Sequence, residues 1–402
     1  MHERLKNFAE VGEPTKFGEA MTIVGGHFAK PVENDDLLRM AIEYGLEENQ
    51  MDASAKAIAA TGFTHRYFSH IPTETLDVFT SIERTTDIGA SLLTNIIKSK
   101  GWQDGIDVFI DTSAFLPTNV NEQVLVKAGL NPTRITTRSY RYACAGAMGA
   151  FIDTISDESL KDARVVIAAL EPLSLLLDKQ QFLSPSTIAF PSIFGDSYTL
   201  MAFNPNRFKL QNKDVLIQPD GGVIKLQAMY DFAKTRDDER SIPKHYRFAN
   251  NGKGIFHYSK EGAFLDIEKP NTPSKVSMDG MATGFFFGDQ TTEVITKLVN
   301  EFGDLNLLKE LNGKNIIMHA ASKPVVDRIA KLLRRHENRY LETPSLPFLM
   351  DTAKYSNSSS ATTLNRWRYM IQNNMLDPNL PMLWIAPGIG SAIAGAIGWI
   401  NP

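Results

Sequence analysis

The sequence predicts an α/β fold with largely parallel, buried sheets, because short apolar runs alternate along the chain with segments of helical spacing. The apolar runs are typical of strands that are covered on both faces, as in sheets flanked by helices. They lie at residues 107–110, 164–170, 197–203 and 315–318.

Helices are predicted at three places among these strands. Residues 147–155 form a largely apolar segment directly after Cys144. Residues 324–335 carry apolar side chains at helical spacing, with basic side chains behind them. Residues 363–374 complete the set, and this helix is expected to stop before Pro378.

The uncharged stretch at residues 383–400 is about long enough to span a bilayer. It contains Pro387, Gly388 and three further glycines, which are breakers of a helix. The stretch therefore predicts a buried strand, a tight glycine turn and a second buried strand, and no membrane segment.

Composition excludes several classes of protein. The 402 residues include 42 basic and 46 acidic side chains, a formal net charge of -4, so no strongly basic field exists to hold nucleic acid. A single cysteine rules out an intramolecular disulfide and a cysteine-rich zinc site, and no metal is expected. Its thiol favours a reducing, cytoplasmic location, and residues 1–17 do not resemble a signal peptide. The polar stretch 231–273 is interpreted as a solvated excursion.

The segment around the cysteine, residues 141–150, has small residues on the C-terminal side of Cys144 that lead into a predicted helix. A thiol at a helix N-terminus lies near free backbone N–H groups and the positive end of the helix dipole, which favour the thiolate. Taken alone, the segment is also typical of a small buried hydrophobe.

Several further residues lie at positions where functional sites are common in α/β proteins. His319 comes at the end of an apolar strand, where sites gather in open α/β sheets. Asn357 lies in a polar loop before a helix, a position at which asparagine is also a frequent cap or turn residue. Gly388 and Gly390 allow close approach of backbone to backbone or ligand. Asp196 precedes a strand and is expected to bind backbone at that turn.

In their order along the chain, these segments resemble β-ketoacyl-[acyl-carrier-protein] synthase III of the thiolase superfamily. The resemblance extends from about residue 22 to residue 400, nearly the whole chain. The segments that carry it are residues 62–66, 144–150, 194–196, 278–287, 319–322, 356–359 and 388–390.

The resemblance implies a five-layered αβαβα thiolase fold with two similarly built halves. Residues 1–205 would carry the nucleophile, and residues 206–402 would carry the histidine and the asparagine. A homodimer is implied, in which a loop near residues 111–117 closes the acyl pocket of the partner. No permanently bound cofactor is implied, and the substrates would be thioesters on acyl-carrier-protein phosphopantetheine or on coenzyme A.

The same resemblance implies an acyltransferase with Cys144, His319 and Asn357 as catalytic residues. Cys144 would take an acyl group from a thioester, with the backbone N–H groups of Cys144 and Ile389 as the oxyanion hole. His319 and Asn357 would hold the carbonyl of a malonyl-type thioester. Its decarboxylation gives the carbanion that condenses with the acyl group, in fatty-acid, polyketide or other secondary-metabolite synthesis.

Three other functions share parts of this pattern. With an alcohol or amine acceptor, His319 would become a general base and the product would be an ester or amide. A cysteine peptidase shows the same chain order of cysteine, histidine and asparagine, but the surroundings of Cys144 do not resemble one. A non-catalytic partner subunit would not need all three residues.

Two differences from the family that the sequence resembles bear on the identity of the substrate. Ser322 stands where the histidine segment usually ends in asparagine, which keeps the ester- or amide-forming alternative open. Lys56 and Ala60 stand in place of a tryptophan and an arginine that bind coenzyme A, and residues 184–190 supply no arginine. An aromatic surface for adenine and a guanidinium for phosphate are thus missing, so acyl groups on a carrier protein are the expected donors.

Overall fold

The computed structural model describes residues 13–29, 31–70, 78–114, 116, 119–140, 142–177, 179–215, 256–259, 262–265, 280–304, 306–311, 313–335, 355–388 and 392–401. The expected excursion at 231–273 lies outside the described residues except for two short strands. These are β10 (Phe256–Ser259) and β11 (Gly262–Leu265), which pair antiparallel.

The first sheet has six strands in the order β1-β2-β8-β7-β5-β6. Every residue of its four central strands is buried, and three of these strands, β5, β7 and β8, coincide with predicted apolar runs. The strands are β1 (Thr15–Phe17), β2 (Met21–Gly26), β5 (Val108–Asp111), β6 (Thr136–Ser139), β7 (Val165–Glu171) and β8 (Ser197–Phe203).

The second sheet has four strands in the order β12-β13-β14-β9. It contains the two strands predicted within residues 383–400, as an antiparallel pair, and residues 389–391 of the expected turn lie outside the described residues. The strands are β9 (Phe208–Val215), β12 (Ile316–Met318), β13 (Met382–Gly388) and β14 (Ala392–Ile400). No helix among the described residues is long and apolar enough to cross a membrane.

The expectation of largely parallel sheets is wrong. β5 pairs in parallel with β6 and with β7, and β12 pairs in parallel with β13, whereas the remaining pairs in both sheets are antiparallel. A continuous apolar run reports burial of a strand on both faces, and it does not report the direction of the neighbouring strand. The connection from β13 to β14 is too short for a crossover, so that pair has to be antiparallel.

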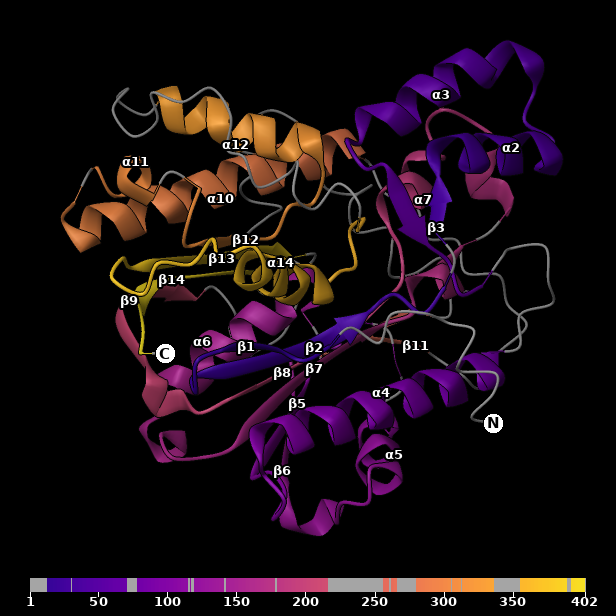
Figure 1. Ribbon diagram of the computed structural model, residues 1–402. Helices are drawn as coiled ribbons and strands as arrows, with labels where there is room; N and C mark the ends of the chain where they lie inside the picture. The colour runs from indigo at the N-terminus through magenta and orange to yellow at the C-terminus, as the bar shows by residue number, and fades with distance from the viewer. Residues whose placement is uncertain are drawn as a thin grey trace.

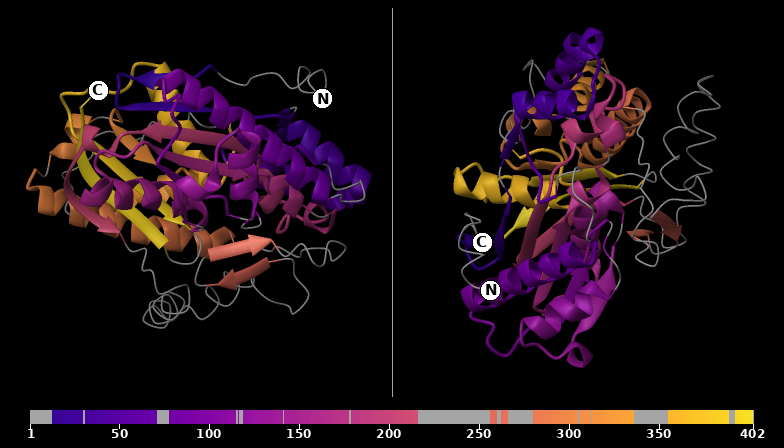
Figure 2. Two further views of the ribbon diagram at one scale, coloured as in Figure 1. Left: turned by 90° about the horizontal axis from the view of Figure 1, so that it is seen from below. Right: turned by 90° about the vertical axis from the view of Figure 1, so that its right-hand side faces the viewer.

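Helices cover both sheets, and the resulting layers follow the order αβαβα (Figure 1 and Figure 2). The predicted helices at 147–155, 324–335 and 363–374 are present as α6, α12 and α14. From one outer layer to the other, the helices are α4 (Val78–Lys100) and α5 (Val120–Lys127), then α6 (Gly146–Ser156) and α14 (Ala361–Gln372), then α10 (Gly280–Phe302), α11 (Leu307–Leu311) and α12 (Lys323–Arg335).

A small subdomain lies beside the first sheet, at the upper right of Figure 1. Its helices contact one another, and its two strands pair antiparallel. It consists of β3 (Pro31–Glu33), α2 (Asn34–Tyr44), α3 (Met51–Ala60), β4 (His65–Tyr67) and α7 (Ala189–Ile193).

The middle layer is where the two sheets share one core. The ring of Phe151 in α6 lies between 5.0 and 5.4 Å, centroid to centroid, from the rings of Phe203, Phe208, Trp367 and Trp384. Those four rings come from β8, β9, α14 and β13. The aromatic cluster therefore fixes α6 between both sheets, and α6 begins directly after Cys144.

Candidate active site

Cys144 lies in a single 3₁₀ turn, Ala143–Ala145, immediately before α6. The turn starts with Ala143 in the left-handed region at φ 46°, which costs a non-glycine residue energy and bends the chain sharply into the helix. The cysteine is 2% exposed. It therefore sits at the start of a helix, as the sequence predicts, but deep inside the protein.

Glycines allow the backbone around Cys144 to lie against the end of β13. A Cβ atom on Gly388 would be 2.5 Å from the carbonyl oxygen of Tyr142 and 2.6 Å from the amide nitrogen of Ala145. No side chain fits at such distances, so the glycine is required by close approach. Ile389 and Gly390 lie outside the described residues, and the oxyanion role of Ile389 stays a prediction.

The electrostatic surroundings of the thiol differ from the expectation. Burial raises the pKa of Cys144 to about 12, and the nearby carboxyl group of Glu171 adds to the rise. The polar side chains of Ser359 and Asn357 act in the opposite direction without offsetting it. Burial and the carboxyl group of Glu171 thus oppose the expected stabilisation of a thiolate by the helix start, and they favour the protonated thiol in the free protein.

His319 directly follows β12, and its backbone N–H donates to the carbonyl oxygen of Ile385 in β13 at 3.0 Å. Its ring is completely buried, and neither Nδ1 nor Nε2 has a hydrogen-bond partner among the described residues. Burial lowers the pKa of His319 to about 3, so the ring is neutral and offers one N–H and one lone pair. Buried polar groups are almost always paired in folded proteins. The unpaired ring is therefore available to a bound molecule.

Asn357 is held by its own loop and by the turn that precedes β8. Its backbone N–H donates to the carbonyl oxygen of Ile193 at 2.8 Å, and its carbonyl oxygen accepts from the N–H of Gly195 at 3.1 Å. Its Oδ1 accepts from the backbone N–H of Ser359 at 2.9 Å, which fixes the orientation of the amide. The side chain is 2% exposed.

Asn357 contacts Cys144 directly and reaches the segment that carries His319 through Ala321. The sulfur of Cys144 donates to Oδ1 of Asn357 at 3.9 Å. Nδ2 of the same amide donates to the carbonyl oxygen of Ala321 at 3.4 Å, two residues after His319. The nucleophile turn, the histidine segment and the asparagine loop thus meet in one buried place, although they come from both ends of the chain.

Glu171, at the end of β7, is a further member of the site that sequence reasoning missed. Its carboxyl group is completely buried and accepts from Oγ of Ser360 at 2.6 Å and from the backbone N–H of Ala114 at 3.1 Å. Oγ of Ser360 in turn accepts from Oγ1 of Thr112 at 3.3 Å. Burial raises the pKa of Glu171 to about 8. An acidic residue that ends a continuous apolar strand was the signal that could have identified it.

Asp196 has the structural role that the sequence predicts. Its carboxyl group is completely buried and accepts from the backbone N–H of Ser69 at 2.7 Å and of Ser174 at 2.6 Å. Both serine hydroxyl groups donate to the same carboxyl group. Asp196 therefore ties three segments together at the turn that positions Asn357. Among the described residues, no three His, Cys, Asp or Glu side chains are grouped to hold a metal ion.

No protein-family model matches this sequence, and no curated protein is significantly similar to it. Solved structures, by contrast, match nearly the whole chain. The 1,3,6,8-tetrahydroxynaphthalene synthase of Streptomyces coelicolor A3(2), a bacterial type III polyketide synthase, has a TM-score of 0.63 at 15% identity and covers 98% of this chain and 100% of its own. The C-terminal type III polyketide synthase domain of Steely1 from Dictyostelium has a TM-score of 0.66 at 12% identity, with coverages of 97% and 100%.

The 3-oxoacyl-(acyl carrier protein) synthase III of Pseudomonas aeruginosa PAO1 is similar to the same extent, with a TM-score of 0.61 at 13% identity and coverages of 95% and 98%. These likenesses establish the fold. The chain has the thiolase fold, and the resemblance to β-ketoacyl-[acyl-carrier-protein] synthase III is confirmed at that level. Type III polyketide synthases share the fold equally well.

Proposed function

We propose that this chain is a condensing acyltransferase, which loads an acyl group from a thioester onto Cys144 and joins it to a malonyl-type thioester by decarboxylative Claisen condensation. The observation that carries the proposal is the buried, unpaired ring of His319, in a segment that contacts the Asn357 amide through Ala321, while the same amide contacts the Cys144 thiol. Acyl transfer requires a nucleophile and hydrogen-bonding groups that can move its proton and stabilise the developing charge.

In the first step, the sulfur of Cys144 attacks the carbonyl carbon of an acyl thioester. Because the pKa of Cys144 is about 12 and that of His319 about 3, the resting pair is an uncharged thiol and an uncharged imidazole. His319 accepts the thiol proton as the carbon–sulfur bond forms. The tetrahedral intermediate then breaks its bond to the carrier sulfur, which leaves with that proton. The products are acyl-Cys144 and a free carrier thiol, and His319 is neutral again.

In the second step, a malonyl-type thioester occupies the place that the carrier left. The N–H of His319 and Nδ2–H of Asn357 donate to its thioester carbonyl oxygen. Cleavage of the bond to the carboxylate releases carbon dioxide and leaves the electron pair as an enolate, whose oxygen these two donors stabilise. The enolate carbon attacks acyl-Cys144, and a carbon–carbon bond forms. The cysteine sulfur leaves as a thiolate, which takes one proton from water to restore the thiol.

We propose an acyl carrier protein as the donor. Lys56 and Ala60 are both exposed on α3, so that surface offers neither an aromatic ring nor a guanidinium at these two positions. The end of α3 adjoins the start of α12, where the N–H of Lys323 donates to the carbonyl oxygen of Thr61 at 2.8 Å. This junction follows directly after the histidine segment and is the proposed mouth of the site.

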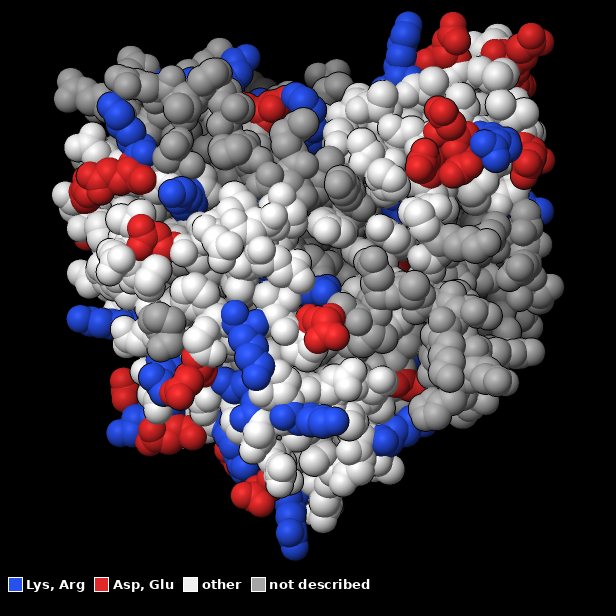
Figure 3. Space-filling view, in the orientation of Figure 1, with Lys and Arg blue, Asp and Glu red and all other residues white. Residues whose placement is uncertain are grey.

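Charge indicates which side of the mouth would receive an acidic carrier. Figure 3 shows basic and acidic residues interspersed over most of this face, with acidic residues gathered over α2 and α3. An acidic partner is repelled there and favours the α12 side, where Lys323 and Lys331 are exposed.

A second activity is favoured by one further observation. Ser322 is 7% exposed and sits just after His319 in place of the usual asparagine. A neutral histidine with a free lone pair can also deprotonate an alcohol or amine, which would then attack acyl-Cys144 and give an ester or amide. The first step is the same in both reactions.

We also propose that the enzyme works as a cytoplasmic homodimer. The strand β6 forms one edge of the first sheet, and three of its four residues are exposed. Such an edge can pair with the same strand of a second copy. The single thiol, on which the chemistry depends, suits a reducing compartment.

Intact-protein mass spectrometry tests the proposal. The protein is incubated with panels of acyl groups on a carrier protein and on coenzyme A, and then with malonyl thioesters. The expected result is one acyl group on Cys144, which is lost with release of carbon dioxide when a malonyl thioester is added. Acylation at another residue, or no acylation by any thioester, contradicts it. Acylation that only an alcohol or amine can discharge selects the second activity.

A further inference from the structure

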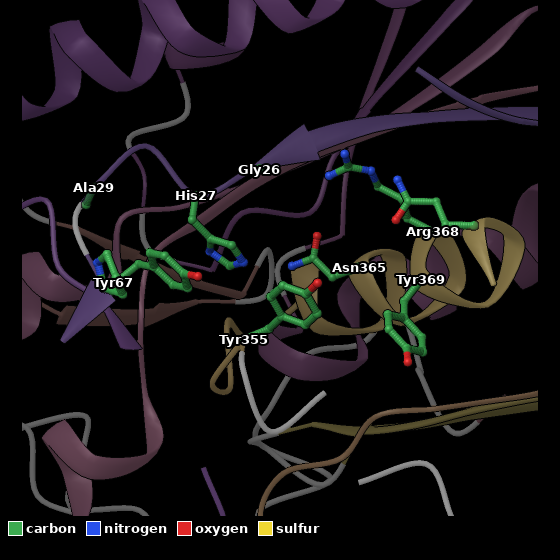
Figure 4. Close-up of a pocket in the computed structure, with 10 residues that line it drawn as sticks. Gly26, His27, Ala29, Tyr67, Tyr355, Asn365, Arg368 and Tyr369 are labelled. Atoms are coloured by element: carbon green, nitrogen blue, oxygen red, sulfur yellow. The ribbon is translucent and has the colours of Figure 1, made fainter. Parts of the chain in front are cut away.

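A cavity of about 430 Å³ opens between the end of β2 and one face of α14. Residues from β2, β4, the loop before Asn357 and α14 line it, and Figure 4 shows their side chains around the space. None of Cys144, His319 and Asn357 lines it. Its volume falls within the range of small-molecule sites, about 300–1,000 Å³.

One wall of the cavity is a stack of three rings. His27 lies parallel to Tyr67, with 3.9 Å between ring centroids and 11° between planes, and parallel to Tyr355 at 5.4 Å and 12°. Nδ1 of His27 lies 2.8 Å from the carbonyl oxygen of Asp196. A carbonyl oxygen can only accept, so Nδ1 carries the hydrogen and Nε2 is an acceptor. Desolvation lowers the pKa of His27 to about 4, so this acceptor persists at neutral pH.

The opposite wall is one face of α14. Asn365, Arg368 and Tyr369 have the three- and four-residue spacing that puts side chains on the same side of a helix. Nη1 of Arg368 donates to the carbonyl oxygen of Gly25, and its Nε donates to Oγ1 of Thr15 at 3.4 Å, so the guanidinium is held in place. Among the described residues that line the cavity, Arg368 bears the one formal charge and none is a carboxylate.

We propose that this cavity is a second binding site, which takes a small aromatic molecule bearing an anionic group and a hydroxyl group, the class of hydroxylated aromatic carboxylic acids. The carboxylate pairs with the planar guanidinium of Arg368. The hydroxyl group donates to Nε2 of His27. The aromatic ring packs against Tyr355 and Tyr369. The site is independent of the cysteine chemistry, because the lining shares no residue with the catalytic three.

A molecule bound in the cavity would nevertheless contact residues that adjoin the Asn357 loop. Tyr355 is two residues before Asn357, and the intervening Ser356 is in the left-handed region at φ 56°. On the other side, His27 binds Asp196, whose neighbour Gly195 donates to the carbonyl oxygen of Asn357 at 3.1 Å. A molecule that contacts His27 and Tyr355 therefore touches both segments that hold the asparagine.

Isothermal titration calorimetry with para-hydroxybenzoate tests the proposal, on protein whose Cys144 has first been alkylated with iodoacetamide. The expected result is binding of one equivalent. Benzoate lacks the donor and para-hydroxybenzyl alcohol lacks the carboxylate, and each should bind about tenfold more weakly, the loss of about 1.4 kcal/mol in binding free energy. Arg368→Met should abolish binding, and Arg134→Met, an exposed arginine outside the cavity, should leave it unchanged.

His27→Phe keeps an aromatic ring in the stack and removes Nε2, and it serves as the second variant if Arg368→Met does not fold. It should bind para-hydroxybenzoate no better than benzoate. Three results overturn the proposal: no heat of binding at millimolar probe, equal binding of all three compounds, or binding that is unaffected by both variants. Binding to unmodified protein alone also overturns it, because the probe then sits at Cys144.

Discussion

The sulfur of Cys144 and Oδ1 of Asn357 lie 3.9 Å apart, and the sulfur is the donor in this contact. A sulfur that donates carries its proton, and the rise in the pKa of Cys144 to about 12 on burial favours the same protonated thiol. It also turns Nδ2 of Asn357 towards the histidine segment, where it donates to Ala321. Oδ1 thus faces the thiol that is proposed to take the acyl group, and Nδ2 faces the histidine segment that is proposed to hold the malonyl thioester.

Alkylation of Cys144 is expected to be slow at neutral pH and to accelerate with pH. Iodoacetamide reacts with the thiolate, whose fraction rises about tenfold per pH unit below the pKa. One equivalent should add and abolish acyl loading, as followed by intact mass. Cys144→Ser should fold like the wild type, by circular dichroism, and accept no acyl group. A rate that does not change with pH would mean that the thiolate is already formed.

Asn357→Ala should slow malonyl decarboxylation by about 10²-fold, the usual cost of one lost donor to a developing oxyanion. Acyl transfer to Cys144 should be largely kept, because Asn357 is assigned to the enolate. Release of labelled carbon dioxide and single-turnover acylation measure the two steps. Asn306→Ala, an exposed asparagine, is the matched control. Loss of self-acylation with decarboxylation intact would reverse the assignment.

Glu171→Gln is expected to lower the pKa of Cys144, because it removes a carboxyl group that raises this pKa. The pKa of Glu171 is about 8, so the charge is present mainly above that pH. The variant should therefore be alkylated faster than the wild type above about pH 8 and at a similar rate at neutral pH. A rate difference that is the same at every pH would indicate a change of shape rather than of charge.

The same group makes stability depend on pH. The folded-state pKa of Glu171, about 8, lies above the unfolded value of about 4.3, so its contribution is fully present below about pH 4 and is lost as pH rises through about 8. The free energy of unfolding of the wild type should therefore fall more over this window than that of Glu171→Gln. Urea titrations across the window measure both. Equal slopes for the two proteins would show that Glu171 does not titrate there.

Gly388→Ala should disturb the nucleophile through the backbone. The new Cβ would lie 2.5 Å from the carbonyl oxygen of Tyr142, so β13 or the cysteine turn has to shift. Overpacking of this kind typically costs about 1–3 kcal/mol of stability. The midpoint temperature of thermal unfolding and the rate of acyl loading should both fall. A variant with unchanged stability and loading would show that the two segments are not in contact.

Acyl groups on a carrier protein should load Cys144 much faster than the same groups on coenzyme A. Single-turnover acylation at equal donor concentration makes the comparison. Lys331→Glu, on the exposed side of α12, should slow loading from the carrier only, and Lys209→Glu, exposed on β9, should not. Equal rates from both donors would show that other residues have rebuilt a nucleotide site.

Local signals in the sequence predicted the buried strands and the helices, whereas the catalytic roles of Cys144, His319 and Asn357 stay predictions. The apolar runs at 164–170 and 197–203 are the buried strands β7 and β8, and the helix after Cys144 is α6. Strand direction was not predictable in the same way, since burial on both faces gives the same apolar run for either direction. The division of the chain at residues 205 and 206 stays a prediction.

The properties of the site that were missed depend on contacts between distant segments. The pKa of Cys144 is set by burial beneath β13 and by Glu171, and neither is visible in the residues around the cysteine. Glu171 itself stands alone in an apolar run and gains its role from Ala114 and Ser360, which are far away in sequence. The cavity beside α14 is likewise lined by residues that are far apart in the sequence.

The ring of Phe151 has a consequence for how the protein unfolds. Its partners Phe203 and Trp384 belong to different sheets, so neither sheet can lose its inner face without exposing the other. The two sheets should therefore melt in one cooperative transition, with the fluorescence of the buried tryptophans and the helical circular dichroism signal changing together. A chain cut at residue 205 would yield two fragments that each lack half of this core, and the fragments should fold only when they are mixed.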